Sequence, residues 1–355
     1  MKKLTKFLFA FLLISSACVD PFEVEIPGEE QLLTVEAVLT SEPGRQRVRL
    51  TRSDRYGSVF EGLVRPVTGA TVIVRDDLGK VSFLEEDSDE RGSYFTDPSF
   101  ATEVGRSYSL QIQTSQGAVY SSFPEQVNAV PEINSVELET IRIPAEGEEN
   151  DRSGVQILAE ISDPEEENNF YFWRNGPSVY VLETRPDLFT PRPSDSNPSR
   201  DPQPKECCIT CYRSEMVGNQ GIFIANDDNF NGLTTRIPVG FIEDDGLRFV
   251  NTYRVDLRQI SISQEAYRFL RLVKQQTEIS GSVFDPPPAN IRSNMINLED
   301  PDEVVLGYFI AGAESVRRIY IDAAQLDFVQ PKTIIPDDCR EVEGAQLNPP
   351  ADWNP

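Results

Sequence analysis

Cysteines are the residues of this 355-residue chain whose chemistry is easiest to predict. There are five of them, namely Cys18, Cys207, Cys208, Cys211 and Cys339. An even number besides Cys18 favours one or two disulfides in an exported protein. A bond between the neighbours Cys207 and Cys208 would be strained, so we expect Cys339 to pair into the cluster 207–211. A four-cysteine zinc site is the alternative, but its fourth ligand would be remote and would lack a Cys-x-x-Cys partner.

A second pattern with possible chemistry lies at Asp227, Asn229, Asn231 and Gly232, which match the first half of a calcium loop. Oxygen ligands at this spacing suit Ca²⁺. The position of the bidentate glutamate, however, is occupied by Pro238, which supplies no carboxylate. The pattern therefore predicts a structural turn between strands, with calcium as the alternative, and we predict no other cofactor.

Acidic residues dominate the charge of the chain. There are 58 Asp and Glu against 33 Lys and Arg, no histidine, and a formal net charge of −25. The lack of histidine excludes Ser–His and Cys–His nucleophile pairs and imidazole zinc sites. The negative charge argues against nucleic acid as a partner. A glycan hydrolase working with two carboxylates remains compatible, but no pair stands out, so we predict no catalytic residues and no enzyme activity.

The N-terminus has the order of an export and lipidation signal. Residues 1–17 contain a basic start, an apolar run over 7–14 and three small residues, and Cys18 follows directly. The apolar run is too short to span a bilayer core of about 30 Å as a helix, which favours a secretory signal peptide. We expect lipidation of Cys18 and an acidic tether over 18–30. An ordinary signal peptide with a coincidental cysteine is the alternative.

The elements that must position these residues are mostly strands. Short alternating segments such as LLTVEAVLT and RVRLTRS, separated by turn residues, indicate β-sandwiches. We predict two Ig-like or carboxypeptidase-regulatory-like β-sandwich domains, over 31–130 and 131–335, and a tail over 336–355. The second domain is predicted to contain a long Pro-, Ser- and Asp-rich loop over 185–205 and one helix over 263–278, where apolar residues recur at helical spacing.

Segments from nearly the whole mature chain carry a family resemblance. They include CVDPFEVEIP, LLTVEAVLTSEPGRQRVRLTRS, PVTGATVIVRD, SQEAYRFLRLVKQQ, GSVFDPPPANIRSNMIN and VLGYFIAG. These segments resemble an uncharacterised, domain-of-unknown-function family of Bacteroidota outer-membrane lipoproteins, often encoded beside TonB-dependent receptors. The acidic residues directly behind Cys18 also resemble the surface-export signal of such lipoproteins. The resemblance implies a lipid anchor in the outer membrane, an outward orientation and a receptor partner, and it brings no catalytic residues.

The combined expectation is a non-catalytic cell-envelope lipoprotein. We expect it to act as an accessory partner of a TonB-dependent outer-membrane transporter in the uptake of a nutrient or other cargo. Two alternatives stay open at this point: a surface adhesin or scaffold, and a carboxylate-based glycan hydrolase.

Overall fold

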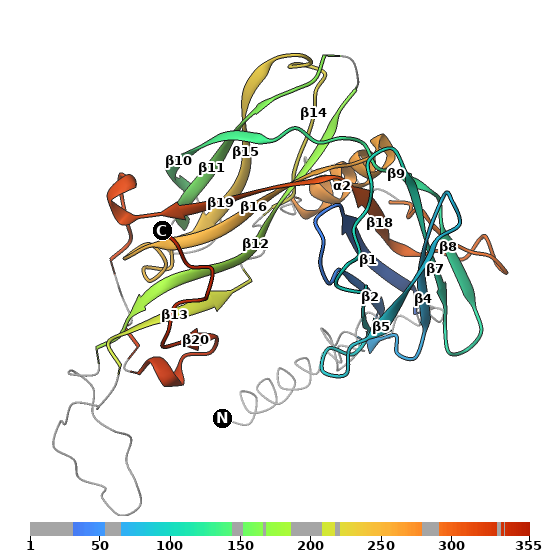
Figure 1. The fold of residues 1–355 in the computed structure, drawn as a ribbon, viewed down its shortest axis with the longest axis horizontal. Coiled ribbons are helices and arrows are strands. Elements are labelled where there is room, and N and C mark those ends of the chain that lie inside the picture. Colours follow the sequence, from blue (N-terminus) through green and yellow to red (C-terminus); the bar gives the residue numbers. More distant parts are fainter. Residues whose placement is uncertain are drawn as a thin grey trace, which may run out of the picture. The chain divides into compact units, whose positions relative to one another are not determined.

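The computed structural model describes residues 31–53, 65–143, 152–165, 168–185, 208–216, 221–278, 291–331, 335–336 and 338–355. The predicted signal peptide, Cys18 and the tether lie outside the described residues, as do Cys207 and nearly all of the loop predicted over 185–205. The described part is mostly β-structure, with three sheets and one α-helix, which confirms the predicted class (Figure 1). No helix within these ranges is long and apolar enough to cross a membrane.

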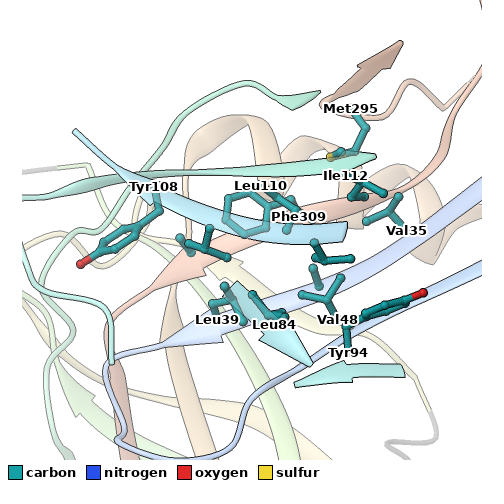
Figure 2. Packing of buried hydrophobic residues seen from close by; sticks show 14 of the residues in the cluster. Val35, Leu39, Val48, Leu84, Tyr94, Tyr108, Leu110, Ile112, Met295 and Phe309 are labelled. Atoms are coloured by element: carbon teal, nitrogen blue, oxygen red, sulfur yellow. The ribbon is translucent and has the colours of Figure 1, made fainter. Parts of the chain in front are cut away.

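The largest sheet has 11 strands in the order β17-β8-β7-β4-β5-β6-β2-β1-β18, with β3 beside β2 and β9 beside β7. Its strands are β1 (Leu33–Thr40), β2 (Arg47–Arg52), β3 (Arg65–Pro66), β4 (Thr71–Asp76), β5 (Val81–Glu86), β6 (Ser93–Phe95), β7 (Ser107–Gln113), β8 (Val119–Ser122), β9 (Glu125–Gln126), β17 (Met295–Asn297) and β18 (Leu306–Gly312). Alternation along β1 fixes which side chains enter the core, because Val35 and Leu39 are buried whereas Glu36 is exposed. Figure 2 shows Val35 and Leu39 packed in one apolar core with Leu110 and Phe309.

Two strands of this sheet come from late in the chain. β18 pairs in parallel with β1, so that Ala37 lies opposite Phe309, and β17 pairs with β8. The boundary predicted at residue 131 therefore does not separate the sheets, because residues 295–297 and 306–312 complete the first one. A strand pattern predicts that a segment is a strand, but it does not identify the partner strand.

Asn294 joins the two returning strands. Its buried side-chain amide donates to the backbone oxygen of Phe309 at 2.8 Å and accepts from the backbone nitrogen of Phe309 at 2.9 Å. The Asn294 side chain thus makes the two hydrogen bonds to Phe309 that the backbone of a neighbouring strand would make. Asn294 directly precedes β17, which begins at Met295. Each buried backbone group left without a partner would cost about 1–3 kcal/mol, so this bridge stabilises the return of the chain.

The other two sheets share a second core. A three-stranded sheet has the order β10-β11-β15, and a six-stranded sheet has the order β19-β16-β12-β13-β20 with β14 beside β12. Trp173 of β12 and Ile157 of β11 belong to the same buried cluster, and the Trp173 indole donates to Gln259 Oε1 at 2.9 Å. The strands are β10 (Ile133–Ile143), β11 (Arg152–Ser162), β12 (Phe170–Glu183), β13 (Thr210–Glu215), β14 (Phe223–Asn226), β15 (Thr234–Glu243), β16 (Tyr253–Ser261), β19 (Glu314–Ile321) and β20 (Ala345–Gln346), with short 3₁₀ turns η1 (Ala323–Gln325) and η2 (Cys339–Glu341).

The helix expected over 263–278 is α2, Gln264–Thr277. Ser263 caps its N-terminus, with the hydroxyl accepting from the backbone nitrogen of Ala266 at 3.0 Å. The helix lies beside β18 (Figure 1). Its apolar face packs there, and the rings of Phe269 and Tyr308 have centroids 4.7 Å apart. Helix α2 therefore contacts β18 of the large sheet and, through Tyr267 against Phe170, β12 of the six-stranded sheet.

The chain passes directly between these sheets from β18 to β19. Ala313, the residue between the two strands, donates its backbone N–H to Ser261 Oγ at 3.0 Å, and the backbone N–H of Ser261 donates to the Ala313 oxygen at 3.0 Å. Thr102 also donates its hydroxyl to the backbone oxygen of Gly312 at 2.9 Å. The bonds with Ser261 hold the chain after β18 against β16, and the bond from Thr102 ties the end of β18 to the segment before β7.

The tail predicted over 336–355 packs on the six-stranded sheet and is fixed there by Cys339. β20 pairs with β13, the ring of Trp353 lies 5.3 Å from that of Tyr212, and Arg254 forms an ion pair with Asp352 at 2.8 Å. The segment has little periodicity because single side chains and one disulfide hold it in place, and such contacts leave no repeating pattern in a sequence.

Candidate functional site

A cavity of about 480 Å³ lies where β1, β12, β16, β18 and α2 come together. We call it the arginine pocket and define it by Arg47, Arg174, Arg258, Phe172, Leu270 and Ile310. Its volume is within the range of about 300–1,000 Å³ that is usual for small-molecule sites. The arginine pocket is therefore the first candidate for a binding site in the described part of the chain.

Alternation along β12 places Phe172 and Arg174 on the same face of the strand. Tyr171 and Trp173 lie on the other face and are fully buried in the second core. Arg258 of β16 is directly opposite Arg174 in the strand pairing. Two positive charges at paired positions of neighbouring strands repel each other, so this arrangement requires compensation.

A bulge in β12 makes room for Arg258. The pairing of β12 with β16 shifts between Asn175 and Ser178, and Gly176 lies in this shift. A Cβ atom at Gly176 would be 3.0 Å from Arg258 Nε, which is closer than almost all real contacts of a Cβ atom. Glycine at this position therefore lets the Arg258 guanidinium lie against the backbone of β12.

Glu314 at the start of β19 supplies the compensating negative charge. Its side chain is fully buried and accepts hydrogen bonds from Thr40 Oγ1 at 2.5 Å and from Arg258 Nη1 at 3.1 Å. Arg174 Nη2 lies 3.9 Å from the same carboxylate. Glu314 does not line the cavity, whereas both arginines do, so the part of the wall formed by β12 and β16 is positive.

The guanidinium of Arg174 makes fewer hydrogen bonds to the described part of the protein than that of Arg258. Glu314 is its ion-pair partner, and within the described part of the chain Arg174 Nε is buried without a hydrogen bond. Burial lowers the pKa of Arg174; the nearby Glu314 opposes that effect, and the positive charges of Arg258 and Arg47 add to it. Arg258 Nε is likewise buried without a partner in the described ranges. The guanidiniums of Arg174 and Arg258 thus share one carboxylate.

Charged residues of both signs stand at the mouth of the pocket. Arg45 and Arg47 line it and pair with acids outside it, Arg45 with Asp87 at 3.0 Å and Arg47 with Glu90 at 2.6 Å. Two exposed glutamates, Glu36 and Glu42, also line the cavity. These surface pairs are solvated and contribute little, so the half-buried Arg174 and Arg258, with the buried Glu314 beside them, determine the charge of the inner wall, which we call the floor.

A second cavity, of about 460 Å³, contains two glutamates. We call it the amide pocket and define it by Glu125, Asn128, Asn168, Gln264, Glu265 and Asn294. Burial raises the pKa of Glu125, hydrogen bonds that include Tyr308 and Asn294 oppose this, and Glu265 adds to it. Glu125 Oε1 accepts from Tyr308 and from Asn294, each at 3.1 Å, so the same carboxylate also supports the Asn294 bridge.

The residues of the calcium pattern form a turn after β14. Asp227 is buried, and its carboxylate accepts from the backbone nitrogen of Asn169 at 2.8 Å, which fastens the turn to the start of β12. Asn229 and Asn231 are exposed. Among the residues that the structure describes, no three His, Cys, Asp or Glu side chains group as a metal site. The contacts of Asp227 are those of a structural turn.

Cys211 and Cys339 are joined by a disulfide whose Cα atoms are 6.0 Å apart. Both cysteines are buried in the second core, beside the half-buried Cys208. The bond links β13 to the segment that leads to β20, so Cys339 pairs with the cluster that the sequence favoured. The pair is then not available as thiolate ligands for the alternative zinc site.

Sequence reasoning missed the arginine pocket because its parts are far apart in the chain. Arg47, Arg174, Arg258 and Glu314 lie on β2, β12, β16 and β19. Each is an ordinary charged residue in an alternating strand, and its neighbours in sequence carry no motif. A faint signal was available in FYFWR, where Arg174 follows Phe172 on the side opposite the core.

Comparison with known proteins gives a family without an assigned role. A family model described as "Domain of unknown function (DUF4249)" matches residues 19–318. No curated protein matches the chain.

Proposed function

We propose that this chain, which belongs to the domain-of-unknown-function family DUF4249, is a non-catalytic lipoprotein of the outer membrane that faces the cell exterior. Its proposed role is that of an accessory partner of a TonB-dependent transporter in nutrient or cargo uptake. The observation that carries the proposal is the basic, apolar and small-residue order that ends at Cys18. Acids at Asp20, Glu23 and Glu25 follow at once, as an exposed tether would require.

Two features of the described residues support a binding role. The arginine pocket is large enough for a small molecule, and its Arg and aromatic side chains can hold a ligand without chemical change. The two separate buried cores also support our proposal of two β-sandwich domains of the Ig-like or carboxypeptidase-regulatory-like kind, with β17 and β18 added to the first.

The membrane anchor is tested by the change Cys18→Ser. We expect the wild-type chain to be labelled by a radioactive fatty acid and to sediment with outer membranes. The variant should lose the label and leave the membrane fraction. The variant Arg317→Gln, which changes an exposed residue of β19, is the control, and it should keep both the label and the location. A Cys18→Ser chain that is still processed and remains in the membrane would refute the lipid anchor.

The outward orientation has its own test. The C-terminal residues Asn354 and Pro355 are exposed, so a tag placed after them is accessible to an antibody. We expect the antibody to stain intact cells that carry the tagged chain. Staining only after the outer membrane is opened would place the protein on the inner side.

We assign the glycan hydrolase alternative to the amide pocket. The amide pocket holds Glu125, which has a raised pKa, and Glu265, as an acid and a second carboxylate would require. That activity would appear as the release of reducing sugars and would disappear in both Glu125→Gln and Glu265→Gln. Our proposal predicts no turnover by any of the three proteins.

The adhesin or scaffold alternative differs in its partner. It predicts a defect in attachment when the protein is deleted, with no transporter retained on the purified chain. The accessory role predicts a defect in uptake and a transporter that co-purifies from detergent-solubilised membranes.

A further inference from the structure

We propose that the arginine pocket binds a small organic carboxylate with an apolar body, and that Arg174 and Arg258 hold the carboxylate. This inference goes beyond the proposed function, because it concerns the chemistry of the ligand and holds whichever partner the protein has. It is carried by the charge of the pocket floor, by the unused donors of its arginines and by the apolar side chains opposite them.

The charge of the floor is the first step. Arg174 and Arg258 face each other across neighbouring strands, and Glu314 is the carboxylate that both of them contact. Glu314 therefore neutralises only one of the two positive charges. The remaining charge is unfavourable where water is partly excluded, and an anion in the cavity would balance it.

The orientation of the donors is the second step. Glu314 lies behind the arginines, and its carboxylate is bonded by Thr40 and Arg258, whereas Arg174 Nη2 is 3.9 Å away. The Arg174 side chain keeps 34% of its surface exposed and lines the cavity. A guanidinium needed only to neutralise Glu314 would lie at hydrogen-bond distance from it. The planar fork of Arg174 is free to bind the two oxygens of a carboxylate.

The apolar wall is the third step, and it argues against a simple inorganic anion. Phe172 of β12, Phe269 and Leu270 of α2 and Ile310 of β18 line the same cavity and belong to the half-buried or buried side chains around the helix. When a ligand with an apolar body fills the pocket, these side chains contact its hydrocarbon part instead of water. Phosphate or sulfate alone would leave this wall uncovered, whereas an aryl or alkyl carboxylate covers it.

The proposal is tested by calorimetric titration of the purified full chain in a nonionic detergent. The probe is phenylbutyrate, and the matched probes are its neutral amide, phenylbutyramide, and inorganic phosphate. We expect phenylbutyrate to bind one site per chain, and both matched probes to bind at least about tenfold more weakly, because a charge-assisted hydrogen bond contributes about 1.5–3 kcal/mol. Equal binding of the amide or of phosphate would overturn the proposal, as would the absence of phenylbutyrate binding.

Variants assign the binding to the pocket. Arg174→Gln should weaken phenylbutyrate binding about 10- to 100-fold, since a charged donor pair is lost. It should leave the thermal unfolding temperature nearly unchanged, because Arg258 still pairs with Glu314. Leu270→Glu, which adds a negative charge to the wall, should also weaken binding. The control Arg317→Gln changes an exposed arginine of β19 outside the pocket and should bind as the wild type does. Unchanged affinity in folded Arg174→Gln and Leu270→Glu would place the site elsewhere and refute the proposal.

Discussion

The buried carboxylate of Glu314 connects residues from two sheets. Its fully buried side chain bonds to Thr40 and Arg258 and contacts Arg174, so it joins the large sheet to the six-stranded sheet through charge. Removing one partner of a buried ion pair leaves an uncompensated charge, which costs about 3–5 kcal/mol.

The change Glu314→Gln should therefore lower the free energy of unfolding by about 3 kcal/mol or more, since two guanidiniums lose their common partner. Urea unfolding followed by circular dichroism measures this quantity. The control Glu42→Gln alters an exposed residue of the same pocket and should change stability by less than about 0.5 kcal/mol. Similar stabilities of the two variants would show that Glu314 is not the charge that holds the arginines.

Glu125 makes stability depend on pH. Burial is the largest effect on this carboxyl group and raises its pKa above the ordinary value of 4.5. The folded protein thus binds this proton more readily than the unfolded chain does. The resulting stabilisation is fully present below 4.5 and is lost as the pH rises through the folded pKa.

Glutamine at position 125 does not titrate, so Glu125→Gln isolates this effect. As the pH rises from 4.5 towards neutrality, we expect the wild type to lose stability relative to the variant. Urea unfolding of both proteins across this interval gives the difference at each pH. A difference that stays constant, or that moves in favour of the wild type as the pH rises, would contradict the burial of an ionisable Glu125.

At the scale of elements, local signals and distant pairings differ in what they reveal. Helix α2 was predictable because Ser263 is a good N-cap and apolar residues recur at helical spacing within one segment. The strands were predictable from alternation. The partners of β17 and β18 were not, because a pairing between residues near 37 and 309 has no local signature. The arginine pocket could not be predicted for the same reason, because its charged residues are far apart in the sequence and come from four strands.

The disulfide between Cys211 and Cys339 tests how the C-terminal segment is held. It closes a separation of 128 residues, and a loop of that size is expected to stabilise the folded chain by about 4–5 kcal/mol. The double change Cys211→Ala and Cys339→Ala should lower the free energy of unfolding by a similar amount. It should also make the segment from residue 338 onward more sensitive to protease, as limited digestion would show.

The control for the disulfide is Val342→Ala, a half-buried residue of the same segment. This change keeps the covalent link and should cost about 1 kcal/mol, as an ordinary loss of apolar contact. If the double variant were no less stable than this control, the disulfide would have no role in holding the segment.

At the scale of the whole molecule, the described residues from Leu32 to Ser53 and from residue 65 onward belong to one compact unit. The two cores are connected by the passage from β18 to β19 and by α2. We therefore expect both cores to unfold together in one transition. The chain has two tryptophans, Trp173 and Trp353, and both lie at the six-stranded sheet.

Tryptophan fluorescence consequently reports on the second core, whereas far-ultraviolet circular dichroism reports on all strands. The urea midpoints from the two signals should coincide. A fluorescence transition clearly separated from the dichroism transition would show that the large sheet unfolds independently and that the link between the sheets is weak.

The central claim is that the protein is an anchored partner of a TonB-dependent transporter, and the most direct test is a pull-down from native membranes. A tag after Pro355 allows purification of the chain from outer membranes dissolved in a mild detergent, and mass spectrometry identifies what remains bound. The account predicts a TonB-dependent transporter in near-equal amount with the wild-type chain. Recovery of the wild-type chain alone, under conditions that preserve other receptor complexes, would contradict the account.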